Sequence, residues 1–291
     1  MTSTTAARSR RAPRPYRQAD VFGTGPMTGN PVAVVLDADG LEEDTMRRFS
    51  AWTNLSETAF VLAPTSSAAD YRVRIFSLNT EIPFALHPTL GTACAWLDAG
   101  GVPATPALVM QECSAGIIPV RVDGHDLAFT APPRTRTGPV EPKLLAQLNE
   151  ILGVTAADVI DAEWLDNGPG WIGVLLADAA TVTRLRPKVA AHSGRWDIGV
   201  IGLHPPGADA AVEVRAFFTD GDQPLREDPV TGSLNAAAAE WLTSTGRLSA
   251  PYIATQGRAV GREGRVHISA DDNRIWVGGR VEITITGVVT I

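Results

Sequence analysis

The sequence predicts an α+β protein built from two similar domains. Three observations lead to this prediction. The chain has 291 residues, about twice the roughly 150 residues of a usual domain. Glycine (27) and proline (21) are spread among short Val- and Ile-rich runs, which is typical of many strands joined by turns. Two turns that open helices, starting at His87-Pro88 and Asp228-Pro229, recur 141 positions apart (228 − 87 = 141).

In the first half, short strands alternate with two helices. A helix is predicted over 41–52, because three acids lie near its start and apolar residues recur at helical spacing. A second helix is predicted from the His87 turn to Leu97, where two glycines follow as a stop signal. Apolar or alternating runs predict strands at 31–37, 58–62, 71–78, 108–111, 117–122 and 127–130.

The second half repeats this order in outline. A cluster of prolines and a glycine over 132–139 predicts a domain boundary. Segment 111–122 then matches 256–268 at an offset of 145 (256 − 111 = 145). We therefore expect domains at 16–135 and 136–291, related by a pseudo-twofold axis. Chance similarity between two common types of helix start is the alternative. Strands are predicted at 171–176, 198–203 and 212–218, and helices near 181–185 and up to 242.

Residues 1–15 are predicted to be a disordered basic tail, because they are rich in Thr, Ala, Arg and Pro and lack hydrophobic periodicity. Five arginines precede the first acid, Asp20. Without them, Lys+Arg falls from 25 to 20 against 32 Asp+Glu, a net charge of −12 (20 − 32 = −12). So acidic a body argues against a nucleic-acid partner, where a basic surface is expected.

The sequence also argues against several other classes of protein. No apolar run approaches the roughly 18 residues of a membrane span. Two cysteines, Cys94 and Cys113, cannot form a disulfide framework and no apolar signal segment follows the start, so a cytoplasmic location is expected. The five histidines show no paired metal-ligand spacing, and the usual phosphate-loop, dinucleotide and nucleophile-elbow motifs are absent. We therefore expect no metal and no cofactor.

Two glycine-hydroxyl pairs, Gly91-Thr92 and Gly232-Ser233, follow the helix-opening turns. Free N–H groups at a helix start suit a carboxylate or phosphate. If the domains are related by a pseudo-twofold axis, the two pairs would hold an anionic substrate from both sides of an interdomain cleft. Plain helix capping is the alternative for each pair.

His87 and Asp228 each stand directly before the proline of these turns. Proline disfavours helical geometry for its predecessor, so both side chains are expected at the cleft end of the turn. Two facing groups with different pKa values can divide acid and base work. A loop histidine and a helix N-cap are the structural alternatives.

Several motifs in order give the chain a specific resemblance. They are Asp20-Val21-Phe22, Gly29 to Val35 (GNPVAVV), Asn54 to Val61 (NLSETAFV), His87 to Ala93 (HPTLGTA), Glu227 to Ser233 (EDPVTGS) and Gln256-Gly257-Arg258. In this order and spacing the chain resembles the PhzF (phenazine biosynthesis) family of isomerases over residues 16–288. The resemblance implies the diaminopimelate-epimerase-like fold, in which each domain wraps a β-sheet around a central helix. It also implies an interdomain site, no cofactor, a homodimer and a role in secondary metabolism.

The resemblance also implies roles for residues. Glu57 matches the family's proton-shuttling acid/base, and His87 and Asp228 match groups that orient the substrate or assist. The family's substrate-binding positions correspond to Ser56, Gly232 and Ser233. Gly91 and Thr92, from their place at a helix start, and Leu86, directly before His87, are also expected to bind substrate. From its own surroundings, Glu57 opens an apolar strand, where desolvation would raise its pKa toward neutrality; an exposed strand-edge glutamate is the alternative. Leu86 stands where the family usually has glycine, and Val230 where a smaller residue is usual.

These observations predict a cofactor-independent isomerase that moves a proton between carbons of a small, anionic, unsaturated metabolite. A hydrogen shift, double-bond migration, or an eliminative or hydrolytic step remain open. Neither cysteine stands at a helix-opening turn, so a two-thiol racemase is not expected. The alternative from another class is a non-catalytic binding or regulatory protein that keeps the cleft, which Leu86 supports.

Overall fold

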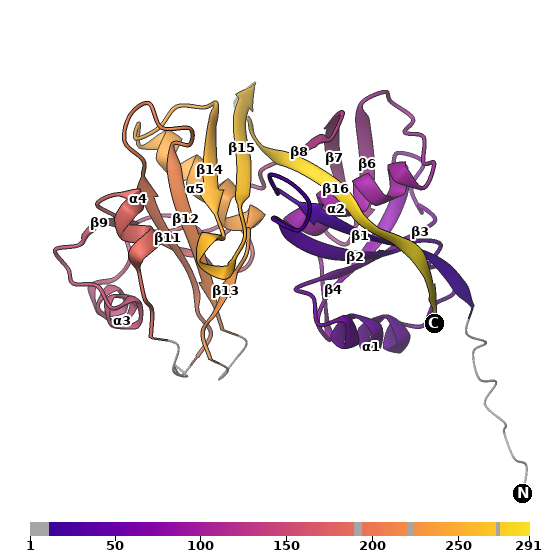
Figure 1. Ribbon diagram of the computed structural model, residues 1–291, viewed down its shortest axis with the longest axis horizontal. Coiled ribbons are helices and arrows are strands. Elements are labelled where there is room, and N and C mark those ends of the chain that lie inside the picture. The colour runs from indigo at the N-terminus through magenta and orange to yellow at the C-terminus, as the bar shows by residue number, and fades with distance from the viewer. Residues whose placement is uncertain (1–11, 189–193, 220–223, 272–273) are drawn as a thin grey trace, which may run out of the picture.

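The computed structural model describes residues 12–188, 194–219, 224–271 and 274–291. Two β-rich domains lie side by side (Figure 1), and the last strand, β16 (Arg274–Thr290), runs from the second domain into the first. Its beginning pairs with strands of both domains and its end pairs with the first strand of the chain. Residues 131–141 carry the chain from the first domain to the second.

The first domain is a closed ring of eight strands around one helix. The strands follow the order β1-β2-β3-β4-β6-β7-β8-β16, and β16 closes the ring on β1. The central helix is α2 (Leu86–Asp98). The other elements are β1 (Pro13–Val21), β2 (Asn30–Val35), α1 (Glu43–Thr53), β3 (Thr58–Leu62), β4 (Tyr71–Ser77), β5 (Thr80–Ile82), β6 (Leu108–Cys113), β7 (Gly116–Asp123) and β8 (Asp126–Thr130).

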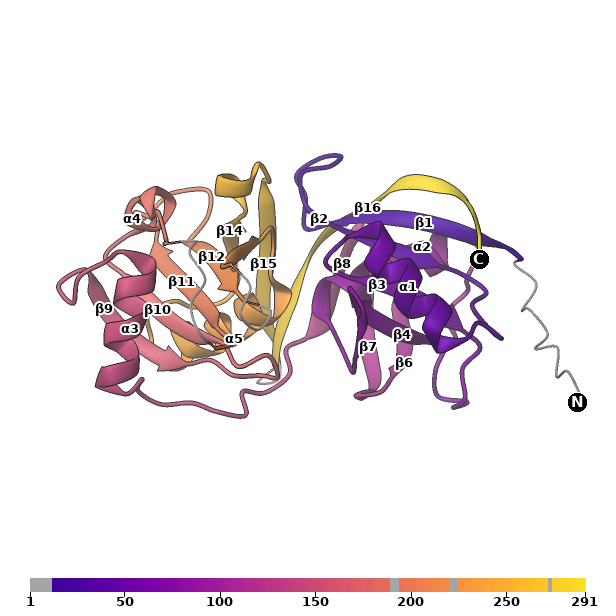
Figure 2. The same ribbon diagram turned by 90° about the horizontal axis from the view of Figure 1, so that it is seen from below.

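Helix α2 lies inside the ring because its sequence is almost free of charge. Its first eight residues and Ala95 are all buried, as expected for a helix that is apolar on every side. Alternation along the strands provides two layers: Val34 packs inward on the core around α2, whereas Val35 packs outward on Met46 and Phe49 of α1. Figure 2 shows α1 on the outside of the first domain.

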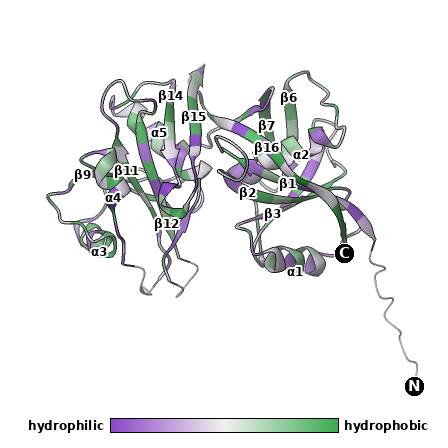
Figure 3. Ribbon diagram, viewed as in Figure 1, coloured by the Kyte–Doolittle hydropathy of each residue, from purple (hydrophilic) through white to green (hydrophobic). Residues whose placement is uncertain are grey.

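The second domain wraps its strands around α5 (Gly232–Ser244). Four consecutive alanines, 236–239, are buried there, and their small side chains let the strands approach the helix closely. Figure 3 shows hydrophobic residues along the strands of both domains. The elements are α3 (Pro142–Leu152), β9 (Val159–Trp164), β10 (Ile172–Leu176), α4 (Ala179–Arg184), β11 (Asp197–Leu203), β12 (Val212–Phe218), β13 (Arg226–Asp228), β14 (Tyr252–Gln256), the 3-10 turn η1 (Arg258–Val260) and β15 (Gly264–Asp271).

The strand pairings show the internal repeat directly. β2–β3 and β4–β6 are parallel pairs in the first domain, and β10–β11 and β12–β14 are parallel pairs in the second. The hairpin β4–β5 likewise corresponds to β12–β13. The strand order is continuous through β16, and its two halves each wrap a central helix, which confirms the predicted α+β fold class.

The equivalence of the two helix starts differs from the sequence prediction. α2 begins at Leu86 and α5 at Gly232, an offset of 146 (232 − 86 = 146), so Leu86 and Gly232 correspond. His87 is therefore the second residue of α2, whereas Asp228 ends β13 before α5 begins. Pro88 is accommodated in the first helical turn, where its missing N–H would have no helical partner in any case.

The chain ends also differ from the predicted division. β1 starts at Pro13, inside the predicted 1–15 tail, and its residues 13–15 pair with Thr290, Val289 and Val288; residues 1–11 lie outside the described ranges. The pairing of β16 with β1 also places the end of the chain in the first domain rather than in 136–291. Both differences arise because two segments without a strong pattern of their own complete one ring. In the described ranges, no helix is long and apolar enough to cross a membrane.

Candidate active site

Glu57, His87 and Asp228 meet where the N-terminal ends of α2 and α5 approach each other. Glu57 directly precedes β3, His87 lies in the first turn of α2, and Asp228 ends β13. Oε2 of Glu57 lies 3.2 Å from Nε2 of His87, with side-chain exposures of 17% and 7%. The negative charge of Asp228 acts on Glu57 from the other domain. The structure thus brings the three predicted catalytic residues together.

Asn30, the first residue of β2, connects this group and is fully buried. Its Nδ2 lies 2.9 Å from the carbonyl oxygen of Val230, 3.3 Å from Oδ1 of Asp228 and 3.4 Å from Nδ1 of His87. The contacts tie the first domain to the turn before α5. Sequence reasoning quoted Asn30 only as part of a motif, because an amide directly before a strand proline does not by itself report contacts with the other domain.

Burial shifts the acidities of the three groups in different directions. It raises the pKa of Glu57 to about 8, with a smaller contribution from the charge of Asp228. It lowers the pKa of His87 to about 3. It raises the pKa of Asp228 to about 6, although hydrogen bonds from Thr231 and Asn30 act in the opposite sense. Near pH 7, Glu57 is therefore mostly protonated, His87 neutral and Asp228 mostly ionised.

The turn that carries Asp228 is held by Gln256, at the end of β14. Its Nε2 donates to the carbonyl of Asp228 (3.1 Å) and to Oγ1 of Thr231 (2.9 Å). Its Oε1 accepts from the N–H of Thr231 (3.0 Å) and from Asn235 (2.8 Å). The hydroxyl of Thr231 in turn donates to Oδ2 of Asp228. Buried and fully partnered, this network fixes the Asp228 carboxylate.

At the start of α5, Ser233 is held by two residues that the sequence analysis did not single out. The indole N–H of Trp171 donates to Oγ of Ser233 (2.8 Å), and Nδ2 of Asn167 donates to its carbonyl (3.0 Å). Because Oγ already accepts a hydrogen bond, its own hydrogen is free to be donated. Ser233 can therefore present a hydroxyl donor, beside the free N–H groups of the helix end, to an anion.

The two helix starts are in direct contact. A Cβ on Gly232 would lie 2.6 Å from Cβ of Leu86, and Leu86 is 7% exposed. Only glycine fits at position 232 with Leu86 in this place. The leucine side chain thus occupies space between the helix ends, where the sequence analysis expects substrate. Ser56, the last predicted binding residue on this side, is half-buried and adjoins Glu57 in the chain.

Gly91 and Thr92 do not lie where the sequence analysis predicts. Both are buried in the second turn of α2, away from its first residues. A Cβ on Gly91 would meet Val32 and Val21 of the surrounding strands, and Oγ1 of Thr92 is buried without a partner. The helix begins one turn earlier than the motif alignment implied, so these residues pack in the core and do not face the cleft.

The cysteines are likewise remote from the three polar groups. Cys94 lies inside α2 and Cys113 ends β6. Burial raises the pKa of Cys94 to about 11 and also raises the pKa of Cys113. Both thiols are thus mostly protonated at neutral pH and poor nucleophiles. Among the described residues, no group of three or more His, Cys, Asp or Glu side chains is arranged to hold a metal ion.

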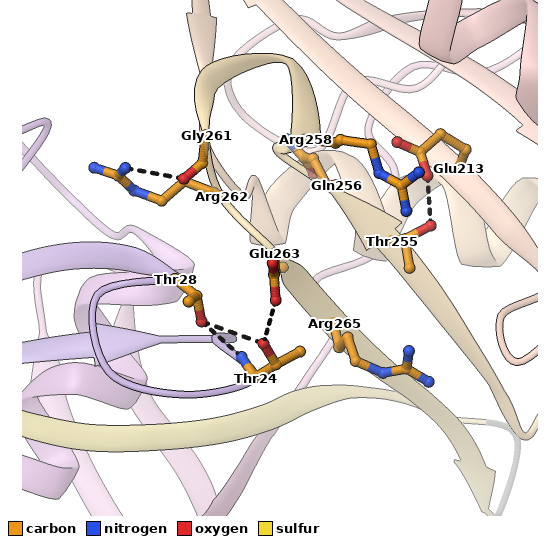
Figure 4. A pocket seen from close by; sticks show the side chains of 11 residues that line it. Thr24, Thr28, Glu213, Thr255, Gln256, Arg258, Gly261, Arg262, Glu263 and Arg265 are labelled. Atoms are coloured by element: carbon orange, nitrogen blue, oxygen red, sulfur yellow. Dashed lines mark hydrogen bonds between the residues drawn. The ribbon is translucent and has the colours of Figure 1, made fainter.

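A cavity of about 430 Å³ lies beside this region, between the β1–β2 loop and the segment after β14. Figure 4 shows Thr24 and Thr28 next to Glu263, with Arg258 and Arg265 on the opposite side of the pocket and Arg262 on the side of Thr28. It shares only Gln256 with the network that holds Asp228. None of Glu57, His87 and Asp228 lines this cavity.

Comparison with known proteins identifies the family. The model of the family described as phenazine biosynthesis-like protein matches residues 19–291. The chain belongs to the PhzF family. A Pseudomonas aeruginosa relative, trans-2,3-dihydro-3-hydroxyanthranilate isomerase, is 30% identical over 88% of this chain and 90% of its own. A Schizosaccharomyces pombe relative, antisense-enhancing sequence 1, is 32% identical over 94% of this chain and 97% of its own.

A PhzF-family crystal structure from Enterococcus faecalis shares the fold. Its TM-score is 0.78 at 23% identity, and the match covers 96% of this chain and all of the other. The family match and the isomerase relatives show that this PhzF-family chain is an isomerase. Glu57, His87 and Asp228 are the ionisable side chains that the structure brings together at the helix starts.

Proposed function

We propose that this PhzF-family isomerase moves a proton between two carbons of a small, anionic, unsaturated metabolite, with Glu57 as the carrier. The observation that supports this most is the position of Glu57: a buried carboxyl, close to His87, with a pKa near 8. A group whose pKa lies close to the working pH can both take and give a proton. We place the reaction in secondary metabolism, without a cofactor.

In this proposal Glu57 must first be ionised to remove a proton from carbon. His87 and Asp228 then hold and orient the substrate from the two domains, and Ser233 with the N-terminal end of α5 binds its anionic group. The same carboxyl returns the proton to the second carbon. Because one side chain serves both steps, both carbons must be within reach of the same face of the substrate.

Turnover of unsaturated carboxylates tests this function. The first probe is trans-2,3-dihydro-3-hydroxyanthranilate, the substrate in the name of the P. aeruginosa relative, followed by other cyclic and acyclic unsaturated acids, all monitored by NMR. We expect at least one to be isomerised. The non-catalytic alternative predicts tight binding of a co-purified ligand and no turnover of any of them. We also propose a homodimer, which analytical ultracentrifugation of the full chain tests.

A further inference from the structure

The amide of Asn30 can be oriented from its contacts. The carbonyl oxygen of Val230 only accepts hydrogen bonds, and it lies 2.9 Å from Nδ2 of Asn30. The nitrogen, not Oδ1, must therefore face this carbonyl. One of the two N–H groups is used in this bond. Asn30 is 0% exposed, so water cannot replace these partners and allow the amide to turn over.

The second N–H of Asn30 points to the two remaining neighbours. Oδ1 of Asp228 lies 3.3 Å away and Nδ1 of His87 3.4 Å away. An amide nitrogen can only donate, so Nδ1 of His87 must present its lone pair. A neutral imidazole carries a single proton, which is then on Nε2. Nε2 is the atom that lies 3.2 Å from Oε2 of Glu57.

We propose that Asn30 is a positioning residue that holds His87 in the Nε2–H tautomer, so that His87 donates a hydrogen bond to the Glu57 carboxylate and does not take its proton. The tautomer is inferred from the contacts alone, and only its effect on proton transfer by Glu57 rests on the proposed function. Nε2 already carries a hydrogen and has no free lone pair, so the mobile proton stays on Glu57. This geometry supports an orienting role for His87 and not a proton-relay role.

The same contacts give Asn30 a second effect. The N–H that it shares between His87 and Asp228 connects a first-domain helix with the turn before α5.

In the structure, Nε2 of His87 and Oε2 of Glu57 are close but not aligned as a hydrogen bond, and each is buried without a hydrogen-bond partner. A small rotation of the Glu57 carboxyl on ionisation would complete the bond.

Long-range ¹H–¹⁵N correlation spectra of the ¹⁵N-labelled full-length protein test this tautomer without any substrate. The His87 signals are identified by their loss in His87→Gln. We expect a neutral ring with the proton on Nε2 from pH 6 to pH 8. A ring protonated on Nδ1, or on both nitrogens, in the unmodified protein would overturn the proposal, whether or not any variant folds.

Asn30→Asp provides the sharper comparison, because it preserves shape but replaces the donor with an acceptor. We expect the His87 proton to move to Nδ1, or the ring to become doubly protonated. Asn235→Asp is the matched control: Asn235 is equally buried and bonds to Thr231 and Gln256, not to His87. An unchanged His87 tautomer in folded Asn30→Asp would contradict the proposal. If the tautomer is as expected but no unsaturated acid is turned over, the proposed function fails and this inference stands.

Discussion

Leu86 and Gly232, the first residues of the two central helices, pack directly against each other at the interdomain site. The contact shows that the two halves of the site are not equivalent. One helix start carries a bulky apolar side chain and His87, and the other carries glycine and a hydroxyl that Trp171 orients. We infer that the anionic group of the substrate is held on the α5 side.

The first prediction concerns Leu86 itself. Leu86→Ala should enlarge the space between the helix ends, so the enzyme should accept bulkier unsaturated acids, with changes in KM between substrates. Leu90→Ala is the control, because Leu90 is buried in the same helix but packs in the core. Both variants should lose roughly 2–5 kcal/mol in the free energy of unfolding. Identical substrate preferences in the two variants would show that Leu86 does not shape the site.

The second prediction concerns the anion-binding hydroxyl. Ser233→Ala should raise KM by about ten- to a hundredfold and leave kcat nearly unchanged, because a hydrogen bond to a spectator anion, worth about 1.5–3 kcal/mol, is made equally in ground and transition states. Trp171→Phe should act in the same direction, since it frees Oγ to rotate. Thr92→Ala, in the buried second turn of α2, should leave KM unchanged. Steady-state kinetics measure KM and kcat for the three variants. An increase in KM for Thr92→Ala equal to that for Ser233→Ala would mean that both helix starts bind the anion, as the sequence analysis expected.

The third prediction is a dependence of stability on pH. Burial raises the pKa of Glu57 to about 8 in the folded protein, against an ordinary glutamate value of 4.5. As pH rises, the unfolded chain loses this proton first, so the native protein loses stability between about pH 4.5 and pH 8. Glu57→Gln removes that loss, and its melting temperature should exceed that of the unmodified protein by a margin that grows up to pH 8.

Glu150→Gln is the control for this experiment, because the Glu150 side chain is 75% exposed. This side chain lies at the surface in an ion pair with Lys188 (3.7 Å), so the melting temperature of Glu150→Gln should not show a margin over the unmodified protein that grows toward pH 8. A margin for Glu57→Gln that is constant with pH would mean that the Glu57 carboxyl is not destabilised by burial.

The fourth prediction links Asp228 to the activity profile. If Glu57 must be ionised to begin the reaction, kcat/KM should rise with pH to a plateau above about pH 8. The Asp228 charge raises the Glu57 pKa, so Asp228→Asn should move this rise to lower pH, whatever it does to the maximum rate. The pH dependence of kcat/KM for both proteins checks the direction. A shift to higher pH would contradict the electrostatic account.

Much of the fold was predictable because its signals are local. The strand at 58–62 is found with the predicted bounds, since a short apolar run between polar residues is too short for a buried helix and fits a buried strand. The positions of β1 and the end of β16 were missed because their pairing is between residues such as Pro13 and Thr290. No local pattern reports a partner so far along the chain.

Part of the site was predictable from sequence. His87 and Asp228 were singled out because each stands directly before the proline of a turn that opens a helix, whereas Glu57 was assigned through the family resemblance of its motif. The structure brings the three residues together. Gly91 and Thr92 were misplaced because the α2 start lies one turn before the motif alignment put it. Asn30 and Trp171 could not be assigned, since their roles depend on contacts with residues of the other half or of a distant segment.

The central claim, that Glu57 carries the proton, is tested most directly by extended turnover in deuterated water with unmodified protein and Glu57→Gln. The glutamine keeps the size and hydrogen bonding of the side chain but cannot ionise. The proton taken from the first carbon is returned to the second unless the Glu57 carboxyl first exchanges it with solvent, so we expect the unmodified protein to introduce deuterium at the receiving carbon progressively over many turnovers. Folded Glu57→Gln should introduce none, with turnover reduced at least about a hundredfold. Near-native turnover with deuterium at that carbon in Glu57→Gln would contradict the account and direct attention to Asp228.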